Sequence, residues 1–297
     1  MRLERETIFD AAKSTLLPTV RVRPEPDKMA SHTDSKFGGA YYLPEEAEDP
    51  GMELLAQINL SQVPRLEGFP ETGLLQFFIR SDAETFERFL EDGPVWLSNS
   101  GFFQVRYYPE VSENTPAHEN DVPEERWGMD AVAGGMKFEA EEEIATISFG
   151  EEGGLAIDLG FESLANVLMP VFQAAWDADE DDEDDEDDED DDADEEDEDA
   201  EGVYDLTLCS DTDQFARDFG NWGFKLGGHP ALRQGEFRLD HDAYAAHSIL
   251  LFQYDLTVPD PDDPMDLEKD TFGFFIRPED LKARRFDDIL MTHHNCY

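Results

Sequence analysis

Apolar and polar residues recur in the same order in the two halves of this 297-residue chain. Three segments of the first half are matched in the second, as Lys36–Gly39 and Lys225–Gly228, Leu54–Leu60 and Leu250–Leu256, and Phe77–Arg80 and Phe274–Arg277. Internal repetition indicates related structural units. The pattern therefore predicts two β-rich lobes, packed as one unit, in which residues 225–277 repeat residues 36–80.

Alternation within the repeated segments predicts strands with one apolar and one polar face. The apolar faces comprise Leu54, Ala56, Ile58 and Leu60 in one copy and Leu250, Phe252, Tyr254 and Leu256 in the other. The opposite faces carry Leu55, Gln57 and Asn59, or Leu251, Gln253 and Asp255. In the third segment, Phe77 and Ile79, or Phe274 and Ile276, oppose Arg80 or Arg277.

Helix signals are fewer than strand signals. The pattern of residues 5–15 predicts a short amphipathic helix. Ser81 and Glu84 fit a capping box, which predicts a helix that reaches Leu90. A further helix is predicted over 161–176, with a kink or a late start because of Pro170. Further strands are predicted within residues 101–108, 144–149, 155–159 and 202–209. The expected fold class is α+β, mainly β, with an internal duplication and a few peripheral helices.

One segment cannot belong to a core. Of the 25 residues from 177 to 201, 22 are Asp or Glu. Such a run repels itself and buries no apolar surface. It predicts a disordered acidic linker over 177–201 between a first lobe at 1–176 and a second lobe at 202–297.

The charge of the chain limits its partners. The net charge is −51, and the chain remains strongly acidic outside the run. Phosphate backbones and anionic membranes require clustered Lys and Arg, so neither is an expected partner, whereas a basic protein is. The two cysteines and the lack of a signal peptide or a long apolar stretch lead us to expect a cytoplasmic protein.

The repeated polar positions are the candidate site. They comprise Lys36, Gln57, Asn59, Arg80, Lys225, Gln253, Asp255 and Arg277. If these side chains converge near a pseudo-twofold axis, they would form a site that binds an anion or a polar ligand. Alternatively, the amides satisfy buried backbone groups and the cations form duplicated salt bridges. The paired glycines predict positive φ or close backbone approach.

Familiar catalytic motifs are missing from the sequence. It contains no GxSxG, HExxH, paired CxxC or phosphate-loop pattern, so we predict no catalytic residues and no cofactor. His293, His294 and Cys296 are a weak candidate metal site near the C-terminus. Asp260, Asp262, Asp263 and Asp266 lack the Gly and the closing Glu of a calcium loop, which favours a solvated loop.

Several motifs of the chain form a recognisable set. They are Ser35–Gly39 with Leu43-Pro44, Leu54–Asn59 with Pro64 and Leu66–Pro70, Gly73–Phe78, Lys225–Gly228, Leu250–Asp255, and Phe274–Ile276 with Glu279–Leu281. This set resembles the YwqG-like family of uncharacterised bacterial proteins. The resemblance covers most of the chain outside the acidic run. It implies an internally duplicated, mainly β fold in the cytosol, and no particular activity or catalytic residue.

The chain departs from this family pattern in two places. Relatives approach the Phe-Phe-Ile strand through a Trp-Gly-Asp-like motif, where this chain has residues 268–271, and their C-termini resemble Asn-Trp-Asp-Cys, where this chain has residues 293–296. The leading functional expectation is a non-enzymatic interaction protein that uses the groove between the repeats. The alternative is an enzyme or small-molecule binder that uses the repeated Lys, Gln and Arg residues.

Overall fold

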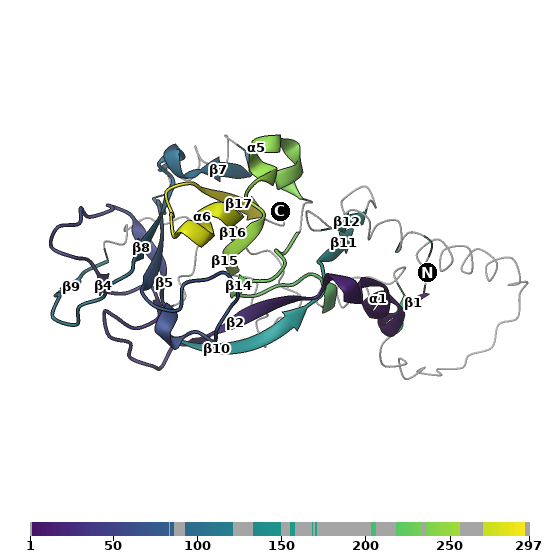
Figure 1. Ribbon diagram of the computed structural model, residues 1–297, viewed down its shortest axis with the longest axis horizontal. Helices are drawn as coiled ribbons and strands as arrows, with labels where there is room; N and C mark the ends of the chain where they lie inside the picture. The colour runs from purple at the N-terminus through teal and green to yellow at the C-terminus, as the bar shows by residue number, and fades with distance from the viewer. Residues whose placement is uncertain are drawn as a thin grey trace, which may run out of the picture.

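A computed structural model describes residues 2–82, 84–85, 93–120, 133–149, 155–157, 168, 170, 203–205, 218–232, 236–255 and 270–294. These residues are mainly β, and eleven strands form one strongly curled antiparallel sheet (Figure 1). The strand order is β7-β17-β16-β15-β14-β2-β10-β3-β5-β6-β8. The predicted mainly β class is thus confirmed.

Two long strands form the centre of this sheet, β2 (Leu17–Glu25) and β10 (Gly134–Glu143). Beyond β10 follow β3 (Lys36–Phe37), β5 (Glu53–Asn59), β6 (Leu74–Ile79) and β8 (Phe103–Tyr108). Beyond β2 follow β14 (Lys225–Gly227), β15 (Ile249–Asp255), β16 (Thr271–Ile276), β17 (Ile289–His294) and β7 (Val95–Leu97). Both repeat copies therefore lie in one sheet, one on each side of the central pair.

Smaller elements surround the sheet. Three short pairs are β1 (Arg2–Glu4) with β13 (Val203–Asp205), β4 (Tyr41–Tyr42) with β9 (Ala117–His118), and β11 (Ile147–Phe149) with β12 (Leu155–Ile157). The helices are α1 (Arg5–Ala12), α5 (Asp242–Ala245) and α6 (Pro278–Ala283), with 3-10 turns η1 (Lys13–Thr15), η2 (Leu60–Gln62), η3 (Ser98–Ser100) and η4 (Phe237–Asp240). None of the helices among the described residues is long and apolar enough to cross a membrane.

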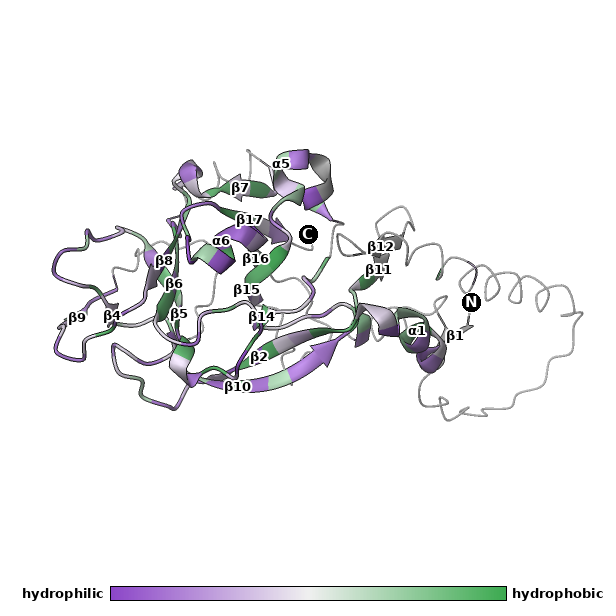
Figure 2. Cartoon of the chain, in the orientation of Figure 1, coloured by the Kyte–Doolittle hydropathy of each residue, from purple (hydrophilic) through white to green (hydrophobic). Residues whose placement is uncertain are grey.

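The curl of the sheet packs the two repeat copies against each other. Phe77 of β6 lies 4.7 Å from Phe252 of β15 and 5.0 Å from Phe274 of β16, measured between ring centroids. Phe37 of β3 lies 4.7 Å from Phe224, which precedes β14. These aromatic contacts belong to one buried cluster that spans both copies. The apolar strands that form this core are green in Figure 2.

The strict alternation predicted for the second repeated segment is wrong at its start. A β-bulge follows Leu54 in β5, and a second bulge follows Leu250 in β15. Each bulge adds a residue that shifts the parity of the strand. Leu55 and Leu251 therefore join the main core, while Leu54 and Leu250 pack in separate clusters on the other face.

The predicted helices have mixed outcomes. α1 and η1 together confirm the helix predicted for residues 5–15. The capping box at Ser81 is not formed, because the Ser81 hydroxyl donates to buried Glu53 and the Asp82 carboxylate instead accepts from the Thr85 N–H at 2.9 Å. Apart from residues 168 and 170, the helix predicted over 161–176 lies outside the described residues, as does the acidic run 177–201.

Other strand predictions are confirmed where the structure describes them. β8 lies within residues 101–108, β11 within 144–149, β12 within 155–159 and β13 within 202–209. β10 and β17 were not predicted. The division into domains at 176 and 202 remains a prediction, because both boundaries lie outside the described residues.

Candidate functional site

The repeated lysine and glutamine residues form two separate pairs in the sheet. Lys36 of β3 is opposite Gln57 of β5, and Lys225 of β14 is opposite Gln253 of β15. The central strands separate the two pairs, because β3 pairs with β10 and β14 pairs with β2. The structure therefore reproduces the repeat in its strand register, but it does not bring the four side chains into one site.

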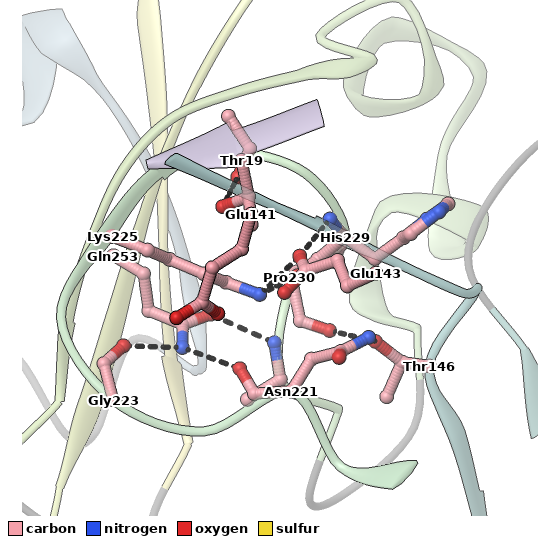
Figure 3. A network of polar contacts seen from close by, with 12 residues as sticks. Thr19, Glu141, Glu143, Thr146, Asn221, Gly223, Lys225, His229, Pro230 and Gln253 are labelled. Atoms are coloured by element: carbon pink, nitrogen blue, oxygen red, sulfur yellow. Dashed lines mark hydrogen bonds and ion pairs between the residues drawn. The ribbon is translucent and has the colours of Figure 1, made fainter. Parts of the chain in front are cut away.

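The second-half pair lies in a closed polar network, which we call the Lys225 cluster (Figure 3). It comprises Lys225, Gln253, Glu143, Asn221 and His229. Glu143 Oε1 accepts hydrogen bonds from Lys225 Nζ at 2.6 Å and from the His229 backbone N–H at 2.7 Å. Lys225 Nζ also donates to the His229 carbonyl. Both members of the ion pair are buried, so each charge compensates the other in a site that excludes water.

Glu143 also connects this cluster to β2. Arg21 Nη2 donates to Glu143 Oε2 at 2.9 Å, and Arg21 Nη1 donates to the Trp222 carbonyl. The carboxylate lies over Gly228, whose φ is +69°. A Cβ at Gly228 would overlap Glu143 Oε1 and would lie 2.8 Å from Thr19 Cβ. Position 228 thus requires glycine both for its backbone conformation and for its close approach to Glu143.

Gln253 holds the segments before and after β14. Its Nε2 donates to the carbonyls of Asn221 at 3.0 Å and Gly223 at 2.9 Å, and its Oε1 accepts from the Ala231 N–H at 2.8 Å. Asp255 accepts from the Gly223 N–H at 2.5 Å. The geometry matches the alternative that this amide satisfies buried backbone groups.

The first-half pair lies in the Lys36 cluster, which comprises Lys36, Gln57, Asn59 and Gln76. Gln57 Nε2 donates to the carbonyls of His32 at 2.9 Å and Asp34 at 2.8 Å. Gln57 Oε1 accepts from the Tyr42 N–H at 3.0 Å and from Gln76 Nε2 at 2.8 Å. Gln57 therefore holds the loop before β3 as Gln253 holds the segment before β14.

Lys36 differs from its repeat counterpart in its partners. Its Nζ donates to the carbonyl of Ser31 at 2.7 Å and to that of Ala40, and no ion pair to it is found among the described residues. Burial lowers the pKa of Lys36 to about 8, and the Asp34 charge opposes this shift. Asn59 Nδ2, in the same cluster, donates to the Thr33 carbonyl at 2.8 Å.

The lowered pKa of Lys36 predicts a pH dependence of stability. Because Lys36 has a pKa of about 8 in the folded chain and an unperturbed lysine has one of about 10.4, the unfolded chain binds more protons between these values. The free energy of unfolding should therefore rise with pH above 8. Relative to Lys36→Met, the wild type should gain about 1 kcal/mol between pH 8 and 9.5, as measured by urea unfolding. Parallel curves for the two proteins would contradict this account.

The repeated arginines lie away from both clusters. Exposed Arg80 donates through Nε to the Gly101 carbonyl at 2.8 Å. Arg277 Nε lies 3.1 Å from Asp288 Oδ2, in an ion pair at the start of α6. These contacts fit the alternative expectation that the repeated cations form structural contacts within the fold and do not bind a ligand. Ligand binding by the eight repeated residues remains a prediction.

A surface groove lies beside the loop that follows β5 and is bordered by the start of β10. We call it the Pro64 groove. It encloses about 480 Å³ and is lined by residues that include Lys28, Asp34, Gln62, Pro64, Met136 and Phe138. A smaller hollow of about 170 Å³ shares Ser61, Val63 and Pro64 with it and extends to Leu226 of β14. The two hollows together span residues of both repeat copies.

Glycine in β14 allows the two copies to approach at the smaller hollow. A Cβ at Gly227 would lie 2.7 Å from Leu66 Cδ2, so Leu66 packs directly on the backbone of the second copy. These residues were not predicted to form a site. The signal was present in the family motif Pro64 with Leu66–Pro70, a proline- and glycine-rich loop between two strands, where binding residues are often found.

The weak metal site proposed for the C-terminus does not gain support. His293 and His294 are buried in β17, and His293 Nε2 lies 2.5 Å from Asp270 Oδ1. His294 stacks on Phe237 at 4.6 Å between ring centroids. Within the described part of the chain, no group of three or more His, Cys, Asp or Glu side chains could hold a metal ion. Cys296 lies outside the described residues.

Comparison with known proteins assigns the chain to a family without a known activity. No curated protein matches it. A family model described as Domain of unknown function (DUF1963) matches residues 35–296, a span that includes both repeat copies, both clusters and most of the Pro64 groove. The chain therefore belongs to the DUF1963 family of domains of unknown function.

Proposed function

We propose that this chain is a non-enzymatic binding protein of the cytoplasm, and that it holds a protein partner in the Pro64 groove and in the smaller hollow beside it, which reaches the second repeat. We also propose that the chain is related to the YwqG-like proteins, and that both repeat copies arose from one duplicated unit. The observation that carries it is the position of the groove. The smaller hollow that shares Ser61, Val63 and Pro64 with the groove reaches Leu226 of the second copy. Met29, which is 98% exposed, lies between groove residues Lys28 and Ala30.

The polar side chains of the groove favour binding over catalysis. Asp34 accepts from the Ser31 N–H at 2.8 Å and from Gln62 Nε2 at 2.8 Å. These hydrogen bonds lower the pKa of Asp34, so it remains a carboxylate at neutral pH rather than a proton donor. Lys28 Nζ forms an ion pair with Glu25 at 2.7 Å. A general acid–base pair requires groups near their working pKa, and the hydrogen bonds to Asp34 hold its pKa below the ordinary value.

A small ligand is the alternative, and the Lys36 amine is the feature that favours it. This buried cation has carbonyl partners, and the described residues form no ion pair with it. An anion bound nearby would therefore compensate its charge. This alternative predicts that inorganic phosphate raises the melting temperature of the protein.

Blocking the groove should remove partner binding. Ser61 is exposed and lines both hollows, so Ser61→Trp fills the space without disturbing the core. Exposed Ser248, just before β15, provides a matched Ser248→Trp control. Proteins captured from lysate at low and high salt are identified, and each is purified and titrated against the three chains. At least tenfold weaker binding is expected for Ser61→Trp, with Ser248→Trp unchanged.

Two results would count against groove binding. One is that no partner is captured at low salt. The other is that captured partners bind Ser61→Trp as tightly as the wild type. Thermal stabilisation by phosphate that Lys36→Met loses, together with unchanged behaviour of Ser61→Trp, would favour the small-ligand alternative.

A further inference from the structure

β10 has one fully paired edge and one edge that is paired only at its start. It pairs with β2 from Gly135 to Glu143, whereas β3 pairs with it only at Gly134 and Gly135. Among the described strands, none continues β3 along β10. β10 therefore presents an open edge beside the point where β3 ends.

The pairing of β2 shows which backbone groups point to this open edge. The Val22 N–H donates to the Phe224 carbonyl, so Val22 faces away from β10. Phe138 is opposite Val22 in the register, and opposite residues of an antiparallel pair face the same way in the ladder. The backbone N–H and C=O of Phe138, Ala140 and Glu142 consequently point to the open edge.

The open edge runs directly into the Pro64 groove. Met136 and Phe138 line that groove together with Ser61, Val63 and Pro64. The Met136 carbonyl already accepts from Lys28 Nζ at 3.2 Å, so the positions that have no pairing partner among the described residues begin after it. Ala140 and Glu142 are exposed and Phe138 is half-buried. An extended chain in this position would continue the line of β3.

We propose that an extended basic segment of the partner protein adds to the sheet as a strand, antiparallel to β10, along residues Phe138–Glu142. This inference rests on the proposed binding function and specifies its geometry. Exposed sheet edges bind extended peptides through main-chain hydrogen bonds, and side-chain pockets provide the selectivity. Here the pocket is the apolar end of the groove.

The side chains of β10 define what such a segment would carry. On the groove face, Met136 and Phe138 are followed by Ala140 and then Glu142. Glu142 forms no ion pair with another described residue. A matching strand has apolar residues at alternate positions and a Lys or Arg opposite Glu142.

The acidic end of β10 has two physical interpretations. Charged residues on an exposed edge strand can simply prevent aggregation, and Figure 2 shows the hydrophilic end of β10. On the other face, however, Glu139 pairs with Arg23 at 2.7 Å and Glu141 with Arg21 at 3.2 Å. These acids are already neutralised. Glu142, which faces the groove side, is the one left to attract a cation.

Synthetic peptides test strand addition directly. The probe is a labelled pentapeptide, Lys-Thr-Val-Thr-Val, whose lysine would lie opposite Glu142 and whose last valine would lie opposite Phe138 in the antiparallel register. Binding is followed by fluorescence anisotropy. N-methylation of its valine amides should weaken binding at least tenfold, because those N–H groups face β10. N-methylation of its threonine amides should change binding less than twofold, because those groups face away.

Variants of the protein provide the reciprocal test. Ala140→Pro removes an N–H that points to the open edge and costs no hydrogen bond to β2, so it should abolish peptide binding while the protein stays folded by thermal melting. Glu142→Lys should weaken the lysine peptide at least threefold and strengthen a peptide that begins with glutamate. If Ala140→Pro fails to fold, the two N-methylated peptides still decide the question.

The outcomes separate this inference from the proposed function. Equal binding of both N-methylated peptides would overturn strand addition, even if Ser61→Trp still removed a captured partner. Absence of binding by every peptide would also overturn it. Dimerisation of the wild type that Ala140→Pro abolishes would identify a second copy of this chain as the occupant, and would likewise overturn a basic partner segment. Loss of partner binding in Ser61→Trp tests the groove independently of all three results.

Discussion

The Gly228→Ala variant should lose several times more stability than the Gly39→Ala variant, although the two glycines occupy equivalent repeat positions. Their φ angles are +69° and +68°, so an alanine at either position costs about 1 kcal/mol for the left-handed backbone. At Gly39 no atom lies within 4 Å of an added Cβ. At Gly228 the Cβ overlaps Glu143 Oε1 and must displace the carboxylate from Lys225. Breaking a buried ion pair costs roughly 3–5 kcal/mol more.

Urea unfolding of the two purified variants measures this difference. The midpoint and slope should be compared with those of the wild type, because an unchanged slope shows that the same folded and unfolded states are compared. We expect a loss of about 1 kcal/mol for Gly39→Ala and about 4 kcal/mol or more for Gly228→Ala. Similar losses for both would mean that Glu143 leaves Gly228 at little cost, and the Lys225 cluster would then not be a rigid unit.

The match between the two halves was visible in the sequence because it rests on residue identity and order. In the structure the matched residues form matching strand pairs within one sheet, with Lys36 opposite Gln57 and Lys225 opposite Gln253. The bulges at Leu54 and Leu250 could not be predicted. A bulge is a property of paired strands, and a run of apolar residues fits either parity.

The central strand β10 escaped prediction because its residues are poor strand formers. Four of its ten residues are glutamate and two are glycine, and both residue types are depleted in strands. Pairing with β2 along nine residues compensates for these weak preferences. Its edge and the Pro64 groove depend on where β3 ends, which is a tertiary feature. The separation of the two polar clusters has the same origin, because the intervening β2 and β10 come from distant parts of the sequence.

The two repeated lysines should differ in how much stability is lost when their charge is removed. Lys225→Met leaves the buried Glu143 carboxylate without its closest cation, and the remaining partner Arg21 lies at 2.9 Å on the other oxygen. We expect a loss of about 3 kcal/mol, because a buried carboxylate that loses one of its two cations is only partly compensated. Lys36→Met frees two carbonyls but removes a buried cation that forms no ion pair with the described residues. Its stability at pH 7 should stay within about 1 kcal/mol of the wild type.

A double variant tests whether the loss comes from the buried Glu143 carboxylate that has lost Lys225. Glu143→Gln keeps an acceptor for the His229 N–H and removes the carboxylate. Combined with Lys225→Met, it should restore at least half of the stability that Lys225→Met alone loses, since buried ion pairs are often replaced at little net cost. The four proteins form a double-mutant cycle measured by urea unfolding. Additive losses in that cycle would show that Lys225 acts through packing, and the contrast with Lys36 would then have no electrostatic basis.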